Sequence, residues 1–264
     1  MIQGLRPLAV AAAALSLAAC AMLPQLSGKA PENVSPSSAA GPIPTKLSGY
    51  LSPAALDGAA LLGPPPAEAS LRGQADRAQY NETRSMAGSA RWTQAIADND
   101  IWAGGALKGY ACAAGKEIGP KATPVLYQLL HRIELDVRTI GTPAKNHYGR
   151  LRPMIGDSQQ ICVPREDWMK TNASYPSGHA MVGWSWGLIL SELEPAKADG
   201  LMAAGRAVGD SRVICGVHFQ SDIEAGRTLA SAMVARLHGD PEFQRDLAAA
   251  RKELARAPAM SCPA

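Results

Sequence analysis

The sequence predicts an all-α fold, a single-domain helical bundle around a buried central helix. Aromatic residues make up only 5% of the 264 residues while Ala, Leu and Gly are abundant, a composition that favours closely packed helices over a β-sandwich. Residues 178–194 are apolar on almost every face, as expected of a helix enclosed by others. We find no alternating strand pattern and no internal repeat.

The first half of the chain contains two helical regions. Residues 66–101 are amphipathic, with interruptions expected at Gly73 and Gly88. Residues 124–142 carry apolar side chains at spacings of three and four, which is typical of one face of a helix. Both regions are therefore expected to be helical.

Four helices are expected in the second half, at residues 178–194, 196–214, 221–237 and 241–256. The last has a clear start signal, because Asp240 is a favourable N-cap and Pro241 suits the first helical position.

The first 19 residues resemble a signal peptide. Arg6 precedes an apolar stretch at residues 8–19 that is too short to span a bilayer. The sequence Leu17-Ala18-Ala19-Cys20 resembles a bacterial lipobox, which predicts cleavage before Cys20 and lipidation of its thiol. The alternative is an ordinary signal-peptidase cut before Met22. The lipoprotein interpretation predicts a periplasmic protein of the bacterial cell envelope, anchored to the outer membrane because Ala21 is not an inner-membrane retention signal.

The rest of the chain divides into two parts. Residues 20–61 are expected to form a lipid-anchored tether and an irregular segment, since residues 26–46 are rich in Ser, Pro and Ala. A proline-rich break at 62–66 begins the compact domain, residues 62–264. The net charge of +3 is spread along the chain, without the basic clusters typical of nucleic-acid binding.

Three separated motifs predict a phosphate-handling site. They are Lys145 with Arg152-Pro153, then Pro176-Ser177-Gly178-His179, and finally Ser211-Arg212 with His218 and Asp222. Each alone has an ordinary explanation: a solvated helix face, a turn, or a surface pair. Together they specify eleven identities in order, with three cations, two imidazoles and a carboxylate, which suits phosphoryl transfer.

These motifs resemble the signatures of the type-2 phosphatidic-acid-phosphatase superfamily, which includes bacterial acid phosphatases and vanadium haloperoxidases. The flanking residues 144–148, 174–175 and 213–216 are similar to those of class A bacterial non-specific acid phosphatases in particular. The resemblance extends from about Leu62 to the end of the chain. It implies a secreted phosphomonoesterase of broad specificity.

The resemblance also implies a role for each motif residue. The phosphate-binding residues would be Lys145, Arg152, Ser177, Gly178 and Arg212. His218 would attack phosphorus to give a phosphohistidine, Asp222 would hold its ring, and His179 would protonate the leaving alcohol and then activate water.

Local geometry adds two expectations near the first motif. Lys145 and Arg152 are two helical turns apart, and Pro153 predicts that the helix ends before Arg152. Glu134 lies about three turns before Lys145 and is a possible pocket acid, although a solvated carboxylate is the more ordinary interpretation.

No metal and no cofactor is expected, because Lys145, Arg152 and Arg212 would repel a dication. His131, His147 and His238 lack metal-ligand spacing, and His147 is interpreted as a packing residue. The expected partners are small phosphate esters, with vanadate as an inhibitor and a homodimer favoured by the resemblance. The alternatives are a vanadium-dependent haloperoxidase and a phosphatase of lipid phosphates or pyrophosphates.

With Cys20 set aside, four cysteines remain, an even number that suits an oxidising compartment. The Cys162–Cys215 pair is favoured because both residues lie near motifs that must converge, which leaves Cys112 for Cys262. The alternative is that one or more of them are free buried thiols.

Overall fold

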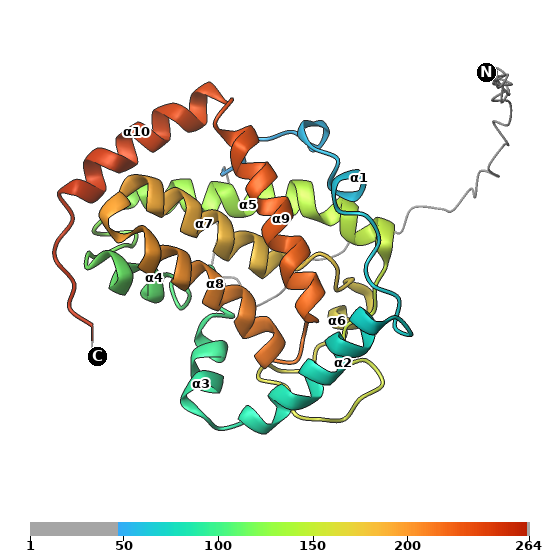
Figure 1. The fold of residues 1–264 in the computed structure, drawn as a ribbon. Helices are drawn as coiled ribbons and strands as arrows, with labels where there is room; N and C mark the ends of the chain where they lie inside the picture. Colours follow the sequence, from blue (N-terminus) through green and yellow to red (C-terminus); the bar gives the residue numbers. More distant parts are fainter. Residues whose placement is uncertain (1–46, 263–264) are drawn as a thin grey trace, which may run out of the picture. The chain divides into compact units, whose positions relative to one another are not determined.

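A computed structural model describes residues 47–262 of the chain (Figure 1). The predicted signal peptide, Cys20 and most of the tether lie outside these residues. The described part contains α-helices, three short 3-10 helices and one isolated bridge between Lys116 and Ala259, without any strand, so the all-α prediction is confirmed. The α-helices are α1 (Gly58–Leu62), α2 (Leu71–Thr83), α3 (Ala90–Ala97), α4 (Leu107–Ala114), α5 (Pro124–Tyr148), α6 (Trp168–Thr171), α7 (Gly178–Leu193), α8 (Ala198–Ile214), α9 (Gln220–Leu237) and α10 (Pro241–Ala255).

The predicted central helix is α7, which packs against α5, α8 and α9 (Figure 1). Trp186 is fully buried in this core, and its indole Nε1 donates to the carbonyl of Leu130 on α5 at 2.9 Å. Tyr110 of α4 donates through its hydroxyl to the carbonyl of Gly183 at 2.6 Å. The polar atoms of both large rings are thus satisfied inside the apolar core.

Glycines let α7 and α8 approach closely. A Cβ atom on Gly183 would lie 2.7 Å from Cβ of Val208, and one on Gly205 would lie 2.7 Å from the carbonyl oxygen of Gly183. Both distances are shorter than the contacts that a real Cβ atom makes with its neighbours. This contact brings the second and third motifs together, since α7 begins in one and α8 ends in the other.

The four C-terminal helices are confirmed within one or two residues at their ends. Asp240 caps α10 through Oδ1, which accepts hydrogen bonds from two backbone amides, and Pro241 is its first residue. The first-motif helix is longer than predicted, because α5 runs through Pro143 and ends only at Gly149, which has a φ of +58°.

The N-terminal half departs further from the sequence prediction. Gly88 separates two helices as expected, but Gly73 lies inside α2 and does not interrupt it. A Cβ on Gly73 would come within 2.2 Å of the Ala67 carbonyl, so this glycine permits a close approach of the preceding turn. Packed structure also begins before Leu62, since Leu51 N donates to Asp136 at 2.8 Å and Gly58 of α1 is buried.

Both preferred disulfide pairings are confirmed. Cys112 of α4 is joined to Cys262 near the C-terminus, with Cα atoms 5.6 Å apart. Cys162 is joined to Cys215 at the end of α8, with Cα atoms 4.6 Å apart. The second bridge ties the loop after the first motif to the third motif.

No helix of residues 47–262 combines the length and the apolarity that crossing a bilayer requires.

The close packing of α7 on α8 generates a stability prediction. Gly183→Ala places a methyl group against Val208 and should destabilise the protein by about 1–3 kcal/mol, the usual cost of overpacking. Gly109→Ala is the matched control at an exposed position of α4, where the nearest atom is 3.8 Å away, and should stabilise by up to about 1 kcal/mol through helix propensity. Urea unfolding of both variants measures the difference; equal free energies of unfolding would contradict the packing argument.

Candidate active site

The three motifs meet at the ends of four helices. Lys145 lies in the last turn of α5, Gly178 begins α7, Arg212 lies in the last turn of α8, and Asp222 lies in the first turn of α9. The backbone amide of Ser177 donates to the Asp222 carbonyl at 3.0 Å, which joins the second motif to the third.

Arg152 follows the end of α5, as Pro153 predicts, and is buried against the third motif. Its Nε donates to the carbonyl of Asn172 at 2.9 Å and its second terminal nitrogen to the Asn172 side-chain oxygen at 2.8 Å. The first terminal nitrogen donates to the Val217 carbonyl at 3.0 Å and lies 3.2 Å from Nε2 of His218. The guanidinium is thus fixed beside the imidazole.

Arg212 and His179 are both held by Asn99. The Arg212 guanidinium donates to the side-chain oxygen of Asn99 at 2.8 Å. Nε2 of His179 donates to the backbone carbonyl of Asn99 at 3.0 Å. Because a carbonyl only accepts, this bond places the Nε2 proton of His179 toward Asn99 and leaves Nδ1 free for other partners.

Three consecutive residues before the second motif each hold a different site residue. Asn172 binds Arg152, as described above. The carbonyl of Ala173 accepts from Lys145 Nζ at 2.7 Å. The hydroxyl of Ser174 donates to Asp222 Oδ2 at 2.6 Å. This short segment therefore orients groups from the first and third motifs together.

Ser174 also contacts the imidazole of His218. Its hydroxyl oxygen lies 3.2 Å from Nδ1 of His218, whereas Asp222 Oδ2 lies 3.4 Å from the same nitrogen. Since the hydroxyl proton goes to Asp222, Nδ1–H of His218 donates toward Ser174. Nε2 then carries the lone pair that faces Arg152. Asp222 thus lies beside His218 as expected, and Ser174 contacts both residues.

A buried ionic network supports the other side of Asp222. Arg150 donates to Asp222 Oδ1 at 2.7 Å and to Asp76 Oδ2 on α2 at 2.8 Å. Asp76 in turn accepts from the backbone amide of Ser221 at 3.0 Å and from its hydroxyl. Arg150 lies at an unspecified position of the first motif, and Asp76 lies far upstream, so motif analysis missed both.

The turn that begins α7 is an ordinary capped helix start. Ser177 is buried, and its hydroxyl accepts from the Ala180 amide at 3.3 Å, while Gly178 is half-buried. The amides at this end carry the positive end of the helix dipole, which favours an anion.

Burial and positive charge lower the pKa of both imidazoles. The pKa of His218 is well below its ordinary value, because of desolvation first and then the charges of Arg152, Lys145 and Arg212. The pKa of His179 is lowered in the same way, by desolvation and then chiefly by Arg212. Both rings are therefore neutral at neutral pH in this environment.

The cations respond to the same environment. Desolvation and neighbouring guanidinium groups lower the pKa of Lys145 well below its ordinary range and that of Arg212 to about 9. Desolvation lowers the pKa of Arg152 to about 10. Both arginines therefore keep their charge at neutral pH.

Glu134 does not take the solvated position expected of it. The carboxylate is buried, and Oε1 accepts from Nε of Arg138 on the same helix at 2.6 Å. Burial raises its pKa to about 7, with Arg138 opposing the shift. The interpretation as a solvated carboxylate is therefore wrong, and Glu134 forms its ion pair with Arg138.

The remaining histidines lie away from the motif contacts. His131 is buried and stacks on Trp102, with ring centroids 5.0 Å apart. His147 is exposed and meets Tyr148 edge-on at 4.7 Å. His238 is exposed and lies 3.3 Å from Glu192. In the described part of the chain no group of three or more His, Cys, Asp or Glu side chains is arranged to hold a metal ion.

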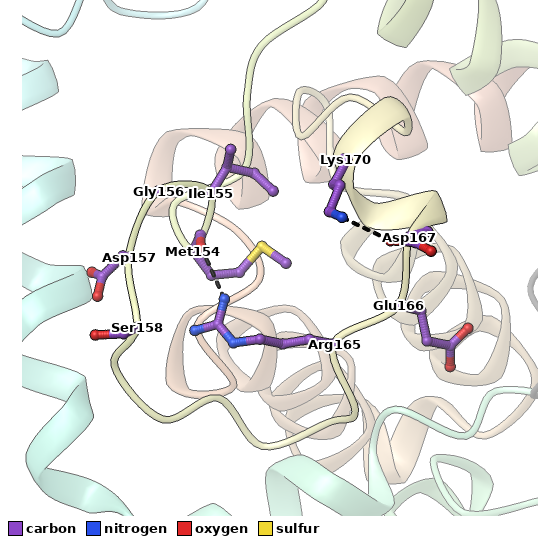
Figure 2. Close-up of a pocket in the computed structure, with 9 residues that line it drawn as sticks. All are labelled: Met154, Ile155, Gly156, Asp157, Ser158, Arg165, Glu166, Asp167 and Lys170. Carbon is purple, nitrogen blue, oxygen red and sulfur yellow. Dashed lines mark hydrogen bonds and ion pairs between the residues drawn. The ribbon is translucent and has the colours of Figure 1, made fainter.

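A pocket of about 580 Å³ lies just beyond Arg152 in the chain (Figure 2). Its walls are Met154, Ile155, Gly156, Asp157, Ser158, Arg165, Glu166, Asp167 and Lys170. Arg165 donates to the Met154 carbonyl at 2.9 Å, and Lys170 pairs with Asp167 at 2.7 Å, as the dashed lines show. None of the eleven motif residues lines this pocket, so it is separate from the predicted phosphate site.

The sequence is similar to that of known proteins. The PAP2 superfamily profile matches residues 135–244, which include all three motifs. An acid phosphatase of Zymomonas mobilis subsp. mobilis is 41% identical over 198 residues, covering 74% of this chain and 75% of the relative. Non-specific acid phosphatases of Providencia stuartii and Salmonella typhimurium are 40% and 37% identical, covering 76% and 73% of this chain and 82% and 78% of those proteins.

The contacts of Ser174 generate a kinetic prediction. Ser174→Ala removes the donor to Asp222 and the acceptor near His218, and should lower kcat/KM by roughly tenfold or more, the usual effect of losing a hydrogen bond to a charged group. Ser185→Ala is the matched control, because Ser185 is equally buried and its hydroxyl has no partner within the described residues. Steady-state kinetics with an aryl phosphate compares them; equal rates would show that Ser174 does not orient His218.

Proposed function

The chain belongs to the PAP2 superfamily, as a phosphomonoesterase of the bacterial acid phosphatase type, and on this premise we propose that it acts through a phosphohistidine formed on His218. The single observation that best supports this is the 3.2 Å distance between Nε2 of His218 and the Arg152 guanidinium. A phosphoryl group bound by Arg152 would lie next to the His218 nitrogen that carries the lone pair.

We propose that substrate binding neutralises the site. Arg152, Arg212 and Lys145 would bind the non-bridging oxygens of the phosphate, with help from the Ser177 hydroxyl and the Gly178 amide. Preorganised cations of this kind stabilise the charge that develops in phosphoryl transfer. Bidentate contacts suit the two guanidinium groups in particular.

The reaction would then proceed in two displacements. In the first, the His218 Nε2 lone pair forms a bond to phosphorus while the ester oxygen leaves, and protonated His179 gives that oxygen a proton to release the alcohol. In the second, neutral His179 takes a proton from water as its oxygen attacks phosphorus. The P–N bond breaks, inorganic phosphate leaves, and His218 is regenerated. Asp222 and Ser174 would stabilise the positive charge that His218 gains in the first step.

The two histidines should be distinguishable by substrate. His218→Ala should abolish phosphoenzyme formation for every ester, because the attacking nitrogen is absent. His179→Ala should slow alkyl phosphates by about 10²–10⁴-fold, the typical contribution of a general acid, and spare an aryl ester whose phenol needs less proton assistance. Single-turnover measurements on folded proteins test both expectations. Equal losses on the two ester classes, or a phosphoenzyme trapped on His179, would contradict the assignment.

We also propose that hydrolysis requires no metal ion and is inhibited by vanadate. A site built from Lys145, Arg152 and Arg212 attracts a phosphate-like oxyanion directly. Activity should therefore persist after exhaustive treatment with a chelator, and vanadate should compete with a phosphate ester. Complete loss on chelation with recovery on adding zinc or magnesium would refute the first part. Halide oxidation by the vanadate-treated protein with peroxide would instead identify a haloperoxidase.

The envelope location remains part of the proposal. Cys20 lies outside the described residues, and its lipidation rests on the lipobox sequence. Cys20→Ser should release the protein from the membrane fraction or block its processing, whereas the unsubstituted protein should carry an acylated N-terminal cysteine detectable by mass spectrometry. A mature N-terminus at Met22 would favour ordinary signal cleavage.

The other proposed partners are small phosphate-ester substrates and a second copy of the chain in a homodimer.

A further inference from the structure

Asn99 contacts two site residues of different predicted function. Its side-chain oxygen accepts from the Arg212 guanidinium at 2.8 Å, and its backbone carbonyl accepts from Nε2 of His179 at 3.0 Å. Asn99 is half-buried and follows α3 directly in the chain. It belongs to none of the three motifs.

Arg212 depends on this contact. Within residues 47–262 the Arg212 side chain has one hydrogen-bond partner, the Asn99 side chain, and its buried Nε has none. Arg212 itself is 2% exposed. With so few hydrogen-bond partners, a buried guanidinium keeps its position only while its hydrogen bond to Asn99 is present.

The residues around Asn99 hold it against α8. Asp98 Oδ2 accepts from the hydroxyl of Ser211, the neighbour of Arg212, at 2.5 Å. Asp100 Oδ1 accepts from the amides of Trp102 and Ala103 at 3.0 and 2.7 Å, which closes the following turn. The Asn99 backbone is therefore anchored on both sides, and its substitution should change the side-chain contact while leaving the carbonyl near His179.

Asn172 supplies a parallel case on the other side of the site. Its side-chain oxygen accepts from Arg152 at 2.8 Å, as that of Asn99 accepts from Arg212. An amide oxygen orients a guanidinium without cancelling its charge, unlike a carboxylate. Both arginines can therefore direct their remaining positive charge to a phosphate.

We propose that Asn99 is a positioning residue that holds Arg212 in the phosphate site through its side chain while its backbone carbonyl orients His179. This rests on the proposed function of the site. Asn99 would act through Arg212 and His179 and would not touch the reacting atoms.

The test is a double-mutant cycle read by binding and by turnover. Asn99→Ala should weaken binding of inorganic phosphate, measured by calorimetry, and lower kcat/KM for aryl and alkyl phosphates alike, each by roughly tenfold. In an Arg212→Ala background the same substitution should have little further effect on phosphate binding, because the side chain then has nothing to hold. Asn81→Ala is the control, since Asn81 accepts one hydrogen bond from Gln159 on the exposed surface, away from the motifs.

The outcomes separate this inference from the proposed function. Unchanged phosphate affinity in Asn99→Ala, or an equal loss in the presence and absence of Arg212, would overturn the role of Asn99 even if the unsubstituted protein hydrolyses phosphate esters. A loss confined to alkyl esters would also overturn it. Absence of phosphatase activity in the unsubstituted protein would instead refute the proposed function. If Asn99→Ala fails to fold, Asn99→Ser provides a polar side chain too short to reach Arg212 and is subject to the same criteria.

Discussion

Three buried or half-buried cations are held close together by oxygens that carry no net charge, and the organisation of the site depends on this constraint. Lys145 donates to the Ala173 carbonyl, Arg152 to the carbonyls of Asn172 and Val217, and Arg212 to the Asn99 amide. None of these cations forms an ion pair with a carboxylate in residues 47–262. Neutral acceptors fix the geometry without neutralising the positive charge, an arrangement that suits the proposed binding of a phosphate dianion. A carboxylate at any of these positions would neutralise part of this charge and weaken anion binding.

The one carboxylate among the motif residues is directed to His218, the proposed nucleophile. Asp222 receives hydrogen bonds from Ser174, from the Phe219 amide and from Arg150, and it lies beside His218. Arg150 is shared with Asp76, so its charge is balanced by two carboxylates and is not offered to the substrate. The protein thus contains two kinds of arginine in this region: Arg150, which is held by carboxylates, and the two proposed phosphate-binding arginines, which are held by neutral oxygens. Sequence alone does not distinguish them, although Arg150 and Arg152 are only two residues apart.

The sequence allowed prediction of what is periodic or carried by a motif. The central helix, the helices after it and the motif residues were identifiable because apolar spacing, caps and fixed motif spacing are local signals. Local signals do not identify three further residues, Asn99, Asn172 and Asp76. Each of them acts through a contact between segments far apart in the chain and belongs to no local pattern. The burial of Glu134 is not predictable for a related reason. Its place on a helix follows from local spacing, but the burial that raises its pKa depends on neighbouring elements. Gly73 was interpreted as a helix break because close approach to Ala67 cannot be inferred from composition.

The same charge imbalance couples protonation to anion binding. The pKa of His179 and of His218 is lowered well below the ordinary value of 6.5, first by desolvation and then by the neighbouring cations. The unfolded chain therefore binds more protons than the folded one below a pH of about 6.5, so acidification lowers the free energy of unfolding. A bound phosphate dianion opposes both effects, because its negative charge favours the protonated imidazole. In the proposed mechanism, the negative charge through which the substrate binds the cations would also raise the pKa of His179. His179 would then acquire its proton preferentially when a leaving group is present to receive it.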